Sequence, residues 1–341
     1  MLREFSFDTK GLGHVLKIGV LTAVILISVD AVGELGADLL AAASATKARK
    51  NVPAISAAKL KGGINKYGFV PTDVSTTSTV YFRKTNLPTH VPIVGGAGAI
   101  AVDLETGAIL FEKNKNDTYP TASIAKLMTA VVVQETLSSS TVITAGPNAI
   151  STYGNTGGIV TGESFRVHDL LYGLLLPSSN DAARMFEVSQ DPPAGGFVSA
   201  MNVKAAALGM TRTHYADSSG LKQETVSSVS DLVRLLRYIY VQHPEIIEAS
   251  RTRRHSVVSS GRKIRHIWDN INWPAGDKKF LGGKAGFTDE AIETMAGIWL
   301  VNPSRSGIRP IGIVVLGSRR RVSDVRAMVS YIENQFVYGT T

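Results

Sequence analysis

Residues 97–130 read AGAIAVDLETGAILFEKNKNDTYPTASIAKLMTA, and this segment predicts a β-hairpin followed by a buried helix. Two apolar runs flank Glu105-Thr106-Gly107, which is the pattern of two strands joined by a tight turn. Ser123 then opens IAKLMTAVVVQETL, which is apolar nearly all round and therefore favours a helix packed on every side. We expect the folded domain to begin near Ala97.

The rest of the chain changes from helical patterns to strand patterns. VHDLLYGLLL and DAARMFEV predict two helices separated by residues 177–180, and another helix is predicted over residues 230–241. After Arg251, the runs KKFLGGKAGF, ETMAGIWLV and RPIGIVVLGS predict strands, and residues 323–336 predict an amphipathic helix. Strands at both ends with helices between them predict an α+β fold. Its antiparallel sheet is built from both termini of the domain and is covered by helices.

The N-terminus carries the features of an export signal. Three basic residues, Arg3, Lys10 and Lys17, precede the uncharged run IGVLTAVILISV at 18–29. This run is shorter than the roughly 20 residues that span a bilayer, and small residues follow it, so it predicts a signal sequence. Residues 31–33 and 43–45 both offer small-x-small cleavage sites, and an uncut segment would serve instead as a membrane anchor.

Three regions follow from these patterns. Residues 1–33 are predicted to be a signal sequence or N-terminal membrane anchor, and residues 34–96, without sustained periodicity, a spacer. Residues 97–341 are predicted to be the folded domain, exported to the cell envelope, at the extracytoplasmic face of the membrane or in the periplasm. The spacer would hold this domain away from the bilayer.

Composition excludes several kinds of protein. The 341 residues carry a formal net charge of +8, which suits a membrane surface or an acidic wall polymer. The longest basic cluster is only Arg319-Arg320-Arg321, which we expect in a solvated loop. Zinc-finger spacing and aromatic-basic RNA motifs are absent, so we expect no nucleic acid partner. The absence of cysteine excludes disulfides, thiolate catalysis and cysteine-zinc sites.

Ser123 and Lys126 form the first candidate catalytic pair. Their spacing places both side chains on one face of a helix, and apolar neighbours would lower the lysine pKa enough for it to act as a base. The same S-x-x-K pattern starts at five serines: Ser44, Ser56, Ser123, Ser219 and Ser260. Only Ser123 opens a strongly apolar helix, so the other four are interpreted as coincidences.

Two further motifs lie downstream. Ser178-Ser179-Asn180 interrupts two predicted helices, where its side chains can project into a cleft, although a helix cap would explain the same residues. Lys284-Ala285-Gly286 lies in a glycine-rich strand, where a ligand could approach the backbone closely. Together S-x-x-K, S-x-N and K-x-G follow the order found in penicillin-binding proteins and class A β-lactamases.

From about Ala97 to Phe336 the chain resembles the low-molecular-mass penicillin-binding proteins, specifically the serine D-alanyl-D-alanine carboxypeptidases. The resemblance extends to DLLYGLLLPSSNDAA, to the turn Ser219-Gly220-Leu221 and to GGKAGFTDEA. It implies a β-lactamase/transpeptidase-like α/β sandwich with an inserted all-helical subdomain. It also implies that the substrates are peptidoglycan stem peptides and that β-lactams act as covalent inhibitors, with no cofactor and no metal.

By this resemblance Ser123 is the acylated nucleophile, Lys126 its base and Ser178 part of the proton relay. The oxyanion hole would be formed by the backbone N–H groups of Ser123 and Phe287. The implied substrate-binding residues are Asn180, Lys284, Ala285, Gly286, Phe287 and Thr288.

Two departures weaken carboxylate recognition in this family model. Ala285 replaces the usual Thr or Ser, and Ile271 stands where the family often has a basic residue between two asparagines. A catalytically weak or inactive wall-peptide binder, or an endopeptidase on cross-links, is therefore an alternative to the carboxypeptidase. A β-lactamase fits less well because no E-x-x-L-N segment follows Asn180. H-E-x-x-H and G-x-S-x-G, which mark metallopeptidases and α/β-hydrolases, are also absent.

Overall fold

The computed structural model describes residues 79–84, 91–150, 153–154, 156–189 and 195–340. All of them belong to one compact unit that begins at Val74. The predicted signal or anchor segment and most of the predicted spacer lie outside the described residues. Among the helices of the described part, none combines the length and apolarity needed to cross a membrane.

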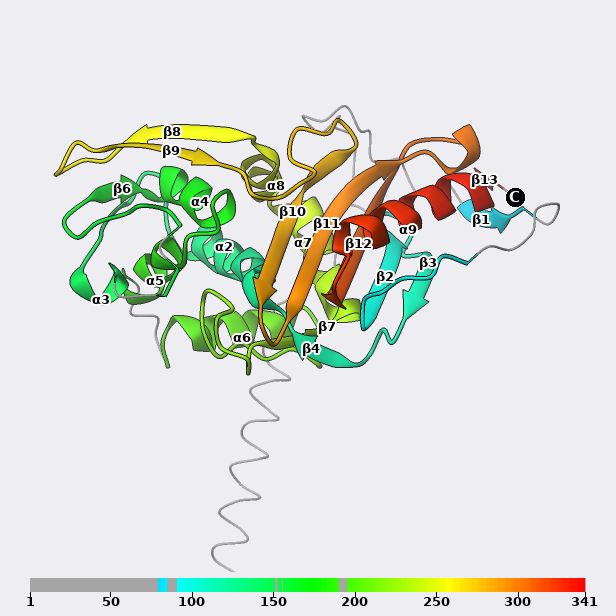
Figure 1. The fold of residues 1–341 in the computed structure, drawn as a ribbon, viewed down its shortest axis with the longest axis horizontal. Coiled ribbons are helices and arrows are strands. Elements are labelled where there is room, and N and C mark those ends of the chain that lie inside the picture. Colours follow the sequence, from blue (N-terminus) through cyan, green and yellow to red (C-terminus); the bar gives the residue numbers. More distant parts are fainter. Residues whose placement is uncertain (1–78, 85–90, 151–152, 155, 190–194, 341) are drawn as a thin grey trace, which may run out of the picture. The chain divides into compact units, whose positions relative to one another are not determined.

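The central feature is a five-stranded antiparallel sheet with strand order β10-β11-β12-β2-β3 (Figure 1). Its strands are β2 (Gly98–Asp103), β3 (Ile109–Lys113), β10 (Phe280–Thr288), β11 (Ile292–Val301) and β12 (Arg309–Ser318). The late strand β12 pairs with the early strand β2, for example Ile313 with Ala101. This pairing joins the two ends of the domain and confirms the predicted sheet.

Helices cover both faces of this sheet. On one face α9 (Arg321–Gln335) packs against β11 and β12, and its Val325 and Met328 enter a core with Ala101 and Ile313. On the other face α7 (Val229–Gln242) packs against β2, β11 and β12. Because side chains alternate along a strand, β2 and β12 are buried on both sides, and they are correspondingly rich in Ile, Val and Ala.

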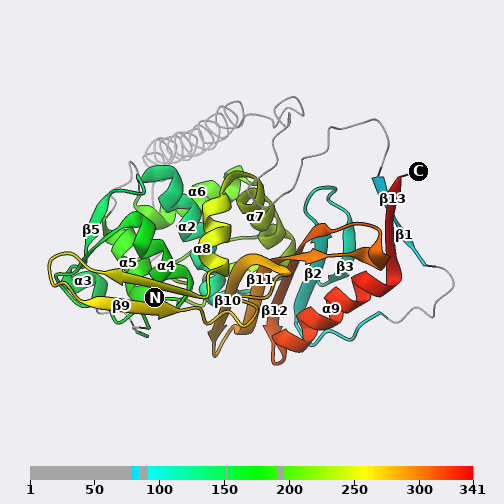
Figure 2. The same ribbon diagram turned by 90° about the horizontal axis from the view of Figure 1, so that it is seen from above.

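A mainly helical region is inserted between β3 and β10 and lies beside the sheet (Figure 2). Its helical elements are the 3₁₀ turn η2 (Ala122–Ile124), α2 (Ala125–Thr136), α3 (Pro147–Ile150), α4 (Val167–Leu175), α5 (Asn180–Ser189), α6 (Phe197–Ala207) and α8 (Pro244–Arg251). The predicted subdomain is not purely helical, because it also carries short strand pairs. They are β4 (Thr118–Pro120) with β7 (Val226–Ser228), β5 (Val142–Thr144) with β6 (Ser164–Arg166), and β8 (Arg254–Val258) with β9 (Arg265–Asp269).

The folded unit extends further toward the N-terminus than the predicted boundary at Ala97. Strand β1 (Thr79–Arg83), inside the predicted spacer, pairs with the C-terminal strand β13 (Phe336–Thr340), which follows the 3₁₀ turn η3 (Pro303–Arg305) and α9. The Tyr81 hydroxyl donates to Asp103 of β2 over 2.5 Å, and Val94 is buried in the core. Without helical or alternating apolar periodicity, the segment gave no local sign of these long-range contacts.

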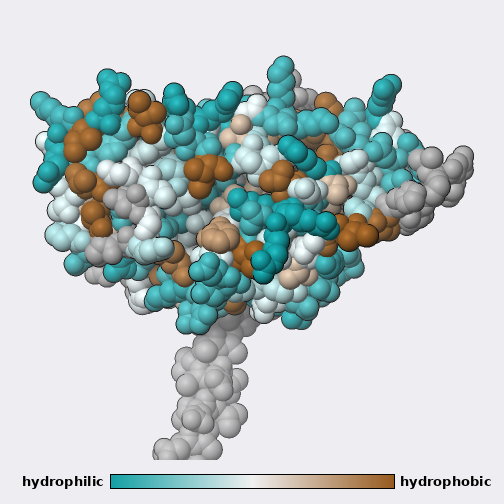
Figure 3. All heavy atoms as spheres, viewed as in Figure 1, coloured by the Kyte–Doolittle hydropathy of each residue, from teal (hydrophilic) through white to brown (hydrophobic). Residues whose placement is uncertain are grey.

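On the face shown in Figure 3, hydrophobic side chains form small separate patches among hydrophilic ones. Scattered exposed apolar residues of this kind are usual for folded domains. Ile267 and Ile271 are both more than half exposed, and so is Phe287 on β10.

Candidate active site

Ser123 lies in the 3₁₀ turn η2, directly before helix α2. Its neighbours Ala122 and Ile124 are buried, whereas Ser123 itself is partly exposed. Ala122 has a left-handed φ of 49°, and the carbonyl of Thr121 accepts a 3.0 Å hydrogen bond from the Thr294 hydroxyl of β11. The strained turn and its bond to the sheet hold the serine hydroxyl at the surface of a packed core.

Lys126 is fully buried and its amine is surrounded by three oxygen acceptors. Nζ lies 2.9 Å from Ser123 Oγ, 2.8 Å from Asn180 Oδ1 and 2.9 Å from the carbonyl oxygen of Ser219. A neutral amine can donate to the amide and the carbonyl while accepting the proton of the serine hydroxyl. Burial lowers the pKa of Lys126 to about 7, against the opposing effect of the Asp217 carboxylate.

The second motif provides a helix cap, a hydrogen bond to Lys126 and a buried serine hydroxyl. Ser179 caps α5, since its Oγ accepts from the N–H of Ala182 at 3.1 Å. Ser178 has a left-handed φ of 63°, and its buried Oγ makes no hydrogen bond to the described residues. Asn180 bridges two segments, because its Nδ2 donates to the Tyr153 carbonyl at 2.7 Å while its Oδ1 accepts from Lys126.

The third motif brings β10 against Ser123. A Cβ on Gly286 would lie 2.7 Å from the backbone nitrogen of Ser123 and 2.9 Å from the Ala122 Cβ, so only glycine allows this approach. Lys284 is fully buried, and its Nζ donates to the Ala285 carbonyl at 2.8 Å. Burial, with the nearby charges of Lys126 and Arg321, holds the pKa of Lys284 well below its usual value.

Two backbone N–H groups at the outer edge of β10 are already bound by side chains. The N–H of Gly283 donates to Ser250 Oγ at 3.0 Å, and that of Ala285 donates to Asn272 Oδ1 at 2.6 Å. Since alternate N–H groups of a strand point the same way, the N–H of Phe287 faces this edge as well. The Phe287 N–H at this edge and the backbone N–H of Ser123, which Gly286 approaches closely, are thus candidate donors to a substrate carbonyl.

The remaining third-motif residues differ in their surroundings. The Ala285 methyl is buried in the core on the α9 side, together with Met295 and Val325. The Phe287 side chain is 62% exposed. The Thr288 hydroxyl accepts from the N–H of Ala291 at 3.1 Å, so it stabilises the turn between β10 and β11.

Arg321 is a site residue that the sequence did not reveal. We expected Arg319-Arg320-Arg321 in a solvated loop, and the first two are exposed. Arg321, however, begins α9 and donates from Nη1 to the Gly286 carbonyl at 2.6 Å. Its Nε is buried and makes no hydrogen bond to the described residues, so the guanidinium retains a free donor beside the third motif. The run of three basic residues gave no sign of this difference.

The turn at residues 217–221 completes the surroundings of Lys126. Gly220 has φ of 80°, and a Cβ there would lie 1.8 Å from the Ala122 carbonyl oxygen. Asp217 accepts from the Ser219 hydroxyl at 2.5 Å and from the Leu221 N–H at 2.9 Å. Although burial acts to raise it, these hydrogen bonds help hold the pKa of Asp217 below its usual value. The carboxylate thus fixes the turn that presents the Ser219 carbonyl to Lys126.

Among the S-x-x-K pairs in the described residues, the structure joins only Ser123 with its lysine. Lys222 and Lys263, the lysines that follow Ser219 and Ser260, are exposed. Ser44 and Ser56 lie outside the described residues. A hydroxyl, a buried amine with a lowered pKa and backbone N–H groups beside the hydroxyl are the components of nucleophilic acyl transfer.

Comparison with known proteins identifies relatives of this arrangement. A family model described as D-alanyl-D-alanine carboxypeptidase matches residues 85–319. A D-alanyl-D-alanine endopeptidase of Pseudomonas aeruginosa is 34% identical over 247 residues, covering 68% of this chain and 74% of the relative. A D-alanyl-D-alanine carboxypeptidase of Mycobacterium tuberculosis is 30% identical over 223 residues, covering 61% of this chain and 72% of the relative.

Solved structures share the fold. A D-alanyl-D-alanine carboxypeptidase from Mycobacterium tuberculosis superposes with a TM-score of 0.64 at 25% identity, covering 76% of this chain and 99% of that one. A Streptomyces DD-transpeptidase superposes with a TM-score of 0.65 at 22% identity, covering 71% of this chain and 98% of that one.

Proposed function

Because the chain belongs to the D-alanyl-D-alanine carboxypeptidase family, we propose that it is a serine DD-peptidase that acts on peptidoglycan stem peptides through an acyl-enzyme on Ser123. The observation that carries this proposal is the 2.9 Å contact between Ser123 Oγ and the amine of Lys126, a base whose pKa lies near neutrality. A base titrating near the working pH is the most effective one for proton transfer.

In the proposed reaction the neutral amine of Lys126 takes the proton of Ser123 Oγ as the oxygen attacks the carbonyl of a D-alanyl residue. The resulting oxyanion accepts hydrogen bonds from the backbone N–H groups of Ser123 and Phe287. Each donor of this kind typically contributes about 2.7–4 kcal/mol of transition-state stabilisation. The Gly286 approach to Ser123 supports this pairing of donors.

Collapse of the oxyanion breaks the peptide bond, and the departing amine needs a proton. We propose that Ser178, whose buried hydroxyl has no partner among the described residues, relays this proton from Lys126. Water then attacks the ester, Lys126 again accepts a proton, and the hydroxyl of Ser123 is restored. Asn180 would orient Lys126 and the substrate amide, and Lys284 and Arg321 would attract a carboxylate on the leaving group.

In its proposed activity the enzyme is a carboxypeptidase that releases a terminal D-alanine. An endopeptidase on cross-linked peptides is the second candidate, because relatives from Pseudomonas aeruginosa and Escherichia coli carry the name D-alanyl-D-alanine endopeptidase. We also propose export to the cell envelope, where such peptides occur.

Incubation with a labelled penicillin, followed by intact-mass measurement and peptide mapping, tests the proposal. We expect a covalent adduct on Ser123 that disappears in Ser123→Ala. Ser260→Ala is the matched control, because Ser260 also starts an S-x-x-K pattern but lies away from a buried lysine. An adduct on another serine, or no adduct on a folded protein, would overturn the nucleophile assignment.

A further inference from the structure

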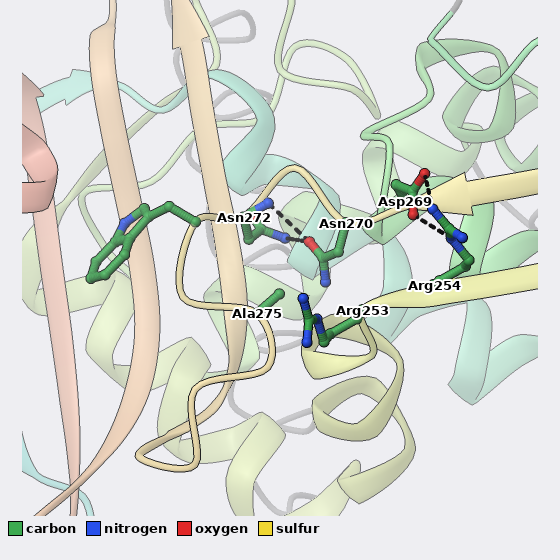
Figure 4. Close-up of a pocket in the computed structure, with 7 residues that line it drawn as sticks. Arg253, Arg254, Asp269, Asn270, Asn272 and Ala275 are labelled. Carbon is green, nitrogen blue, oxygen red and sulfur yellow. Dashed lines mark hydrogen bonds and ion pairs between the residues drawn. The ribbon is translucent and has the colours of Figure 1, made fainter.

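A pocket of about 510 Å³ lies next to the third-motif strand and is not part of the nucleophile site. Figure 4 shows the polar and charged side chains that surround it. Its lining residues are Arg253, Arg254, Asp269, Asn270, Asn272, Trp273 and Ala275. The connection to the active site is direct, because Asn272 lines the pocket and also binds the N–H of Ala285 at 2.6 Å.

The pocket carries one positive charge that its own lining does not balance. Arg254 and Asp269 neutralise each other through two hydrogen bonds of 2.6 and 3.1 Å. Arg253 has no hydrogen bond or ion pair from its guanidinium to the described residues, and Figure 4 shows its side chain directed toward Asn270 and Ala275. A free guanidinium in a concave polar site is suited to a carboxylate or a phosphate.

Local structure holds this arginine in place. Gly276 has φ of 88°, and a Cβ on it would lie only 2.5 Å from Arg253 Cδ, so the arginine stem lies across a glycine that makes room for it. The carbonyl of Arg253 accepts from the N–H of Asn270 at 2.9 Å. The side chain of Asn270 in turn donates to the carbonyls of Ser250 and Thr252, each at 2.8 Å. Both walls of the pocket are therefore tied to the end of α8.

The direction of a bound substrate relates this pocket to the reaction. The proposed oxyanion donors, Ser123 and Phe287, locate the scissile carbonyl beside Gly286. In the proposed reaction Lys284 and Arg321 bind a carboxylate of the leaving group, so the leaving group lies toward the part of β10 that precedes Gly286. A leaving group longer than one residue would continue in that direction, and each further residue would advance it by about 3.3 Å.

A longer leaving group cannot extend along the edge of β10 as an added strand. The N–H groups of Gly283 and Ala285 are already bound by Ser250 and Asn272. The chain must therefore turn away from the strand at Asn272, which is a wall of the pocket. There the unpaired guanidinium of Arg253 is available to an anionic group.

We propose that this pocket is a subsite for a carboxylate on the leaving-group arm of a cross-linked stem peptide, with Arg253 as its binding residue. The inference rests on the proposed DD-peptidase activity and makes it more specific, because a single D-alanine would not reach the pocket. It assigns cross-linked peptides as a substrate class and Arg253 as a residue that distinguishes them from peptides ending in D-alanyl-D-alanine.

The test uses the full chain and three synthetic substrates. The first is a cross-linked peptide pair whose leaving-group arm ends in a free carboxylate, the second is the same pair with that carboxylate amidated, and the third is an uncross-linked peptide ending in D-alanyl-D-alanine. Arg253→Ala should lower kcat/KM for the first substrate about tenfold, the effect expected from losing one charge-assisted interaction at a solvent-accessible site. For the second and third substrates, the kcat/KM of Arg253→Ala should differ from that of the wild type by less than about twofold.

Arg265→Ala is the matched control, because Arg265 is an exposed arginine at the start of β9 that does not line the pocket. Arg265→Ala should leave kcat/KM unchanged for all three substrates. Arg253→Lys should retain part of the kcat/KM for the first substrate that Arg253→Ala loses. The subsite is overturned if Arg253→Ala and Arg265→Ala behave alike, or if Arg253→Ala lowers all three substrates equally.

Penicillin acylation of the same variants separates this inference from the proposed function. Normal acylation with no Arg253 effect overturns the subsite alone, whereas absent acylation of Ser123 overturns the peptidase proposal. The free leaving-group arm can also be titrated directly by calorimetry, and binding that Arg253→Ala does not weaken overturns the subsite. Arg253-dependent binding of a glycerol-phosphate oligomer without binding of the peptide arm would assign the pocket to wall phosphates and overturn the peptide assignment.

Discussion

Raising the pH should switch on acylation of Ser123 by deprotonating Lys126. The amine contacts Ser123 Oγ at 2.9 Å and burial lowers its pKa to about 7. Only the neutral amine can accept the serine proton, so the rate must rise with pH. We expect the second-order rate constant for acylation to increase about tenfold per pH unit well below pH 7 and to level off above about pH 8.

The magnitude follows from the fraction of neutral amine. At pH 7 about half of Lys126 would be neutral, whereas a lysine with the ordinary pKa of about 10.4 would be neutral in roughly 0.04% of molecules. Burial of Lys126 therefore raises the fraction of enzyme molecules with a neutral amine on the order of a thousandfold at neutral pH. Asp217→Asn should move the rising limb to lower pH, because the Asp217 carboxylate opposes the deprotonation of Lys126.

The assay is stopped-flow or rapid-quench acylation by a labelled penicillin between about pH 5 and pH 9, at constant ionic strength. Lys126→Arg should remove acylation throughout this range, since a guanidinium stays protonated. Lys263→Ala, which alters an exposed lysine of another S-x-x-K pattern, should keep the wild-type profile. A pH-independent rate, or a midpoint near that of ordinary lysine, would refute the assignment of Lys126 as the base.

Two substitutions test the packing around the site. Gly220→Ala should destabilise the protein by more than about 2 kcal/mol in urea unfolding and should abolish acylation. The reason is that its Cβ would lie 1.8 Å from the Ala122 carbonyl oxygen, at a left-handed φ. A stable and active variant would contradict this prediction. Ala285→Thr should lower the free energy of unfolding by about 1–3 kcal/mol, since the side chain enters the core beside Met295. An unchanged midpoint in urea unfolding would contradict this packing.

The sequence predicted the central elements because their signals are local. RPIGIVVLGS is β12 at residues 309–318, and the apolar run after Ser123 is α2. The helical pattern over 230–241 corresponds to α7 at Val229–Gln242. Long apolar runs of this kind specify their secondary structure through the surface that they must bury.

Features that depend on distant partners could not be predicted in this way. Strand β1 pairs with β13 more than 250 residues away, and the sequence of β1 does not identify its partner. Arg321 differs from Arg320 only by its position at the start of α9, which directs its guanidinium to Gly286. Asn272 gains its importance from one hydrogen bond to Ala285. Such pairings depend on the geometry of the folded sheet.

The loop before β10 relates the family departure at Ile271 to the proposed subsite. Asn270 and Asn272 serve the backbone there, one binding the end of α8 and the other the N–H of Ala285. Ile271 between them is 57% exposed, so a basic side chain at this position would point to solvent rather than into the core. This chain lacks that charge but carries Arg253 in the pocket formed partly by the same two asparagines. In the proposed subsite the positive charge therefore lies in this pocket, at the place that a longer leaving group would reach. This position supports the proposal of a substrate whose negative charge lies beyond the first residue of the leaving group.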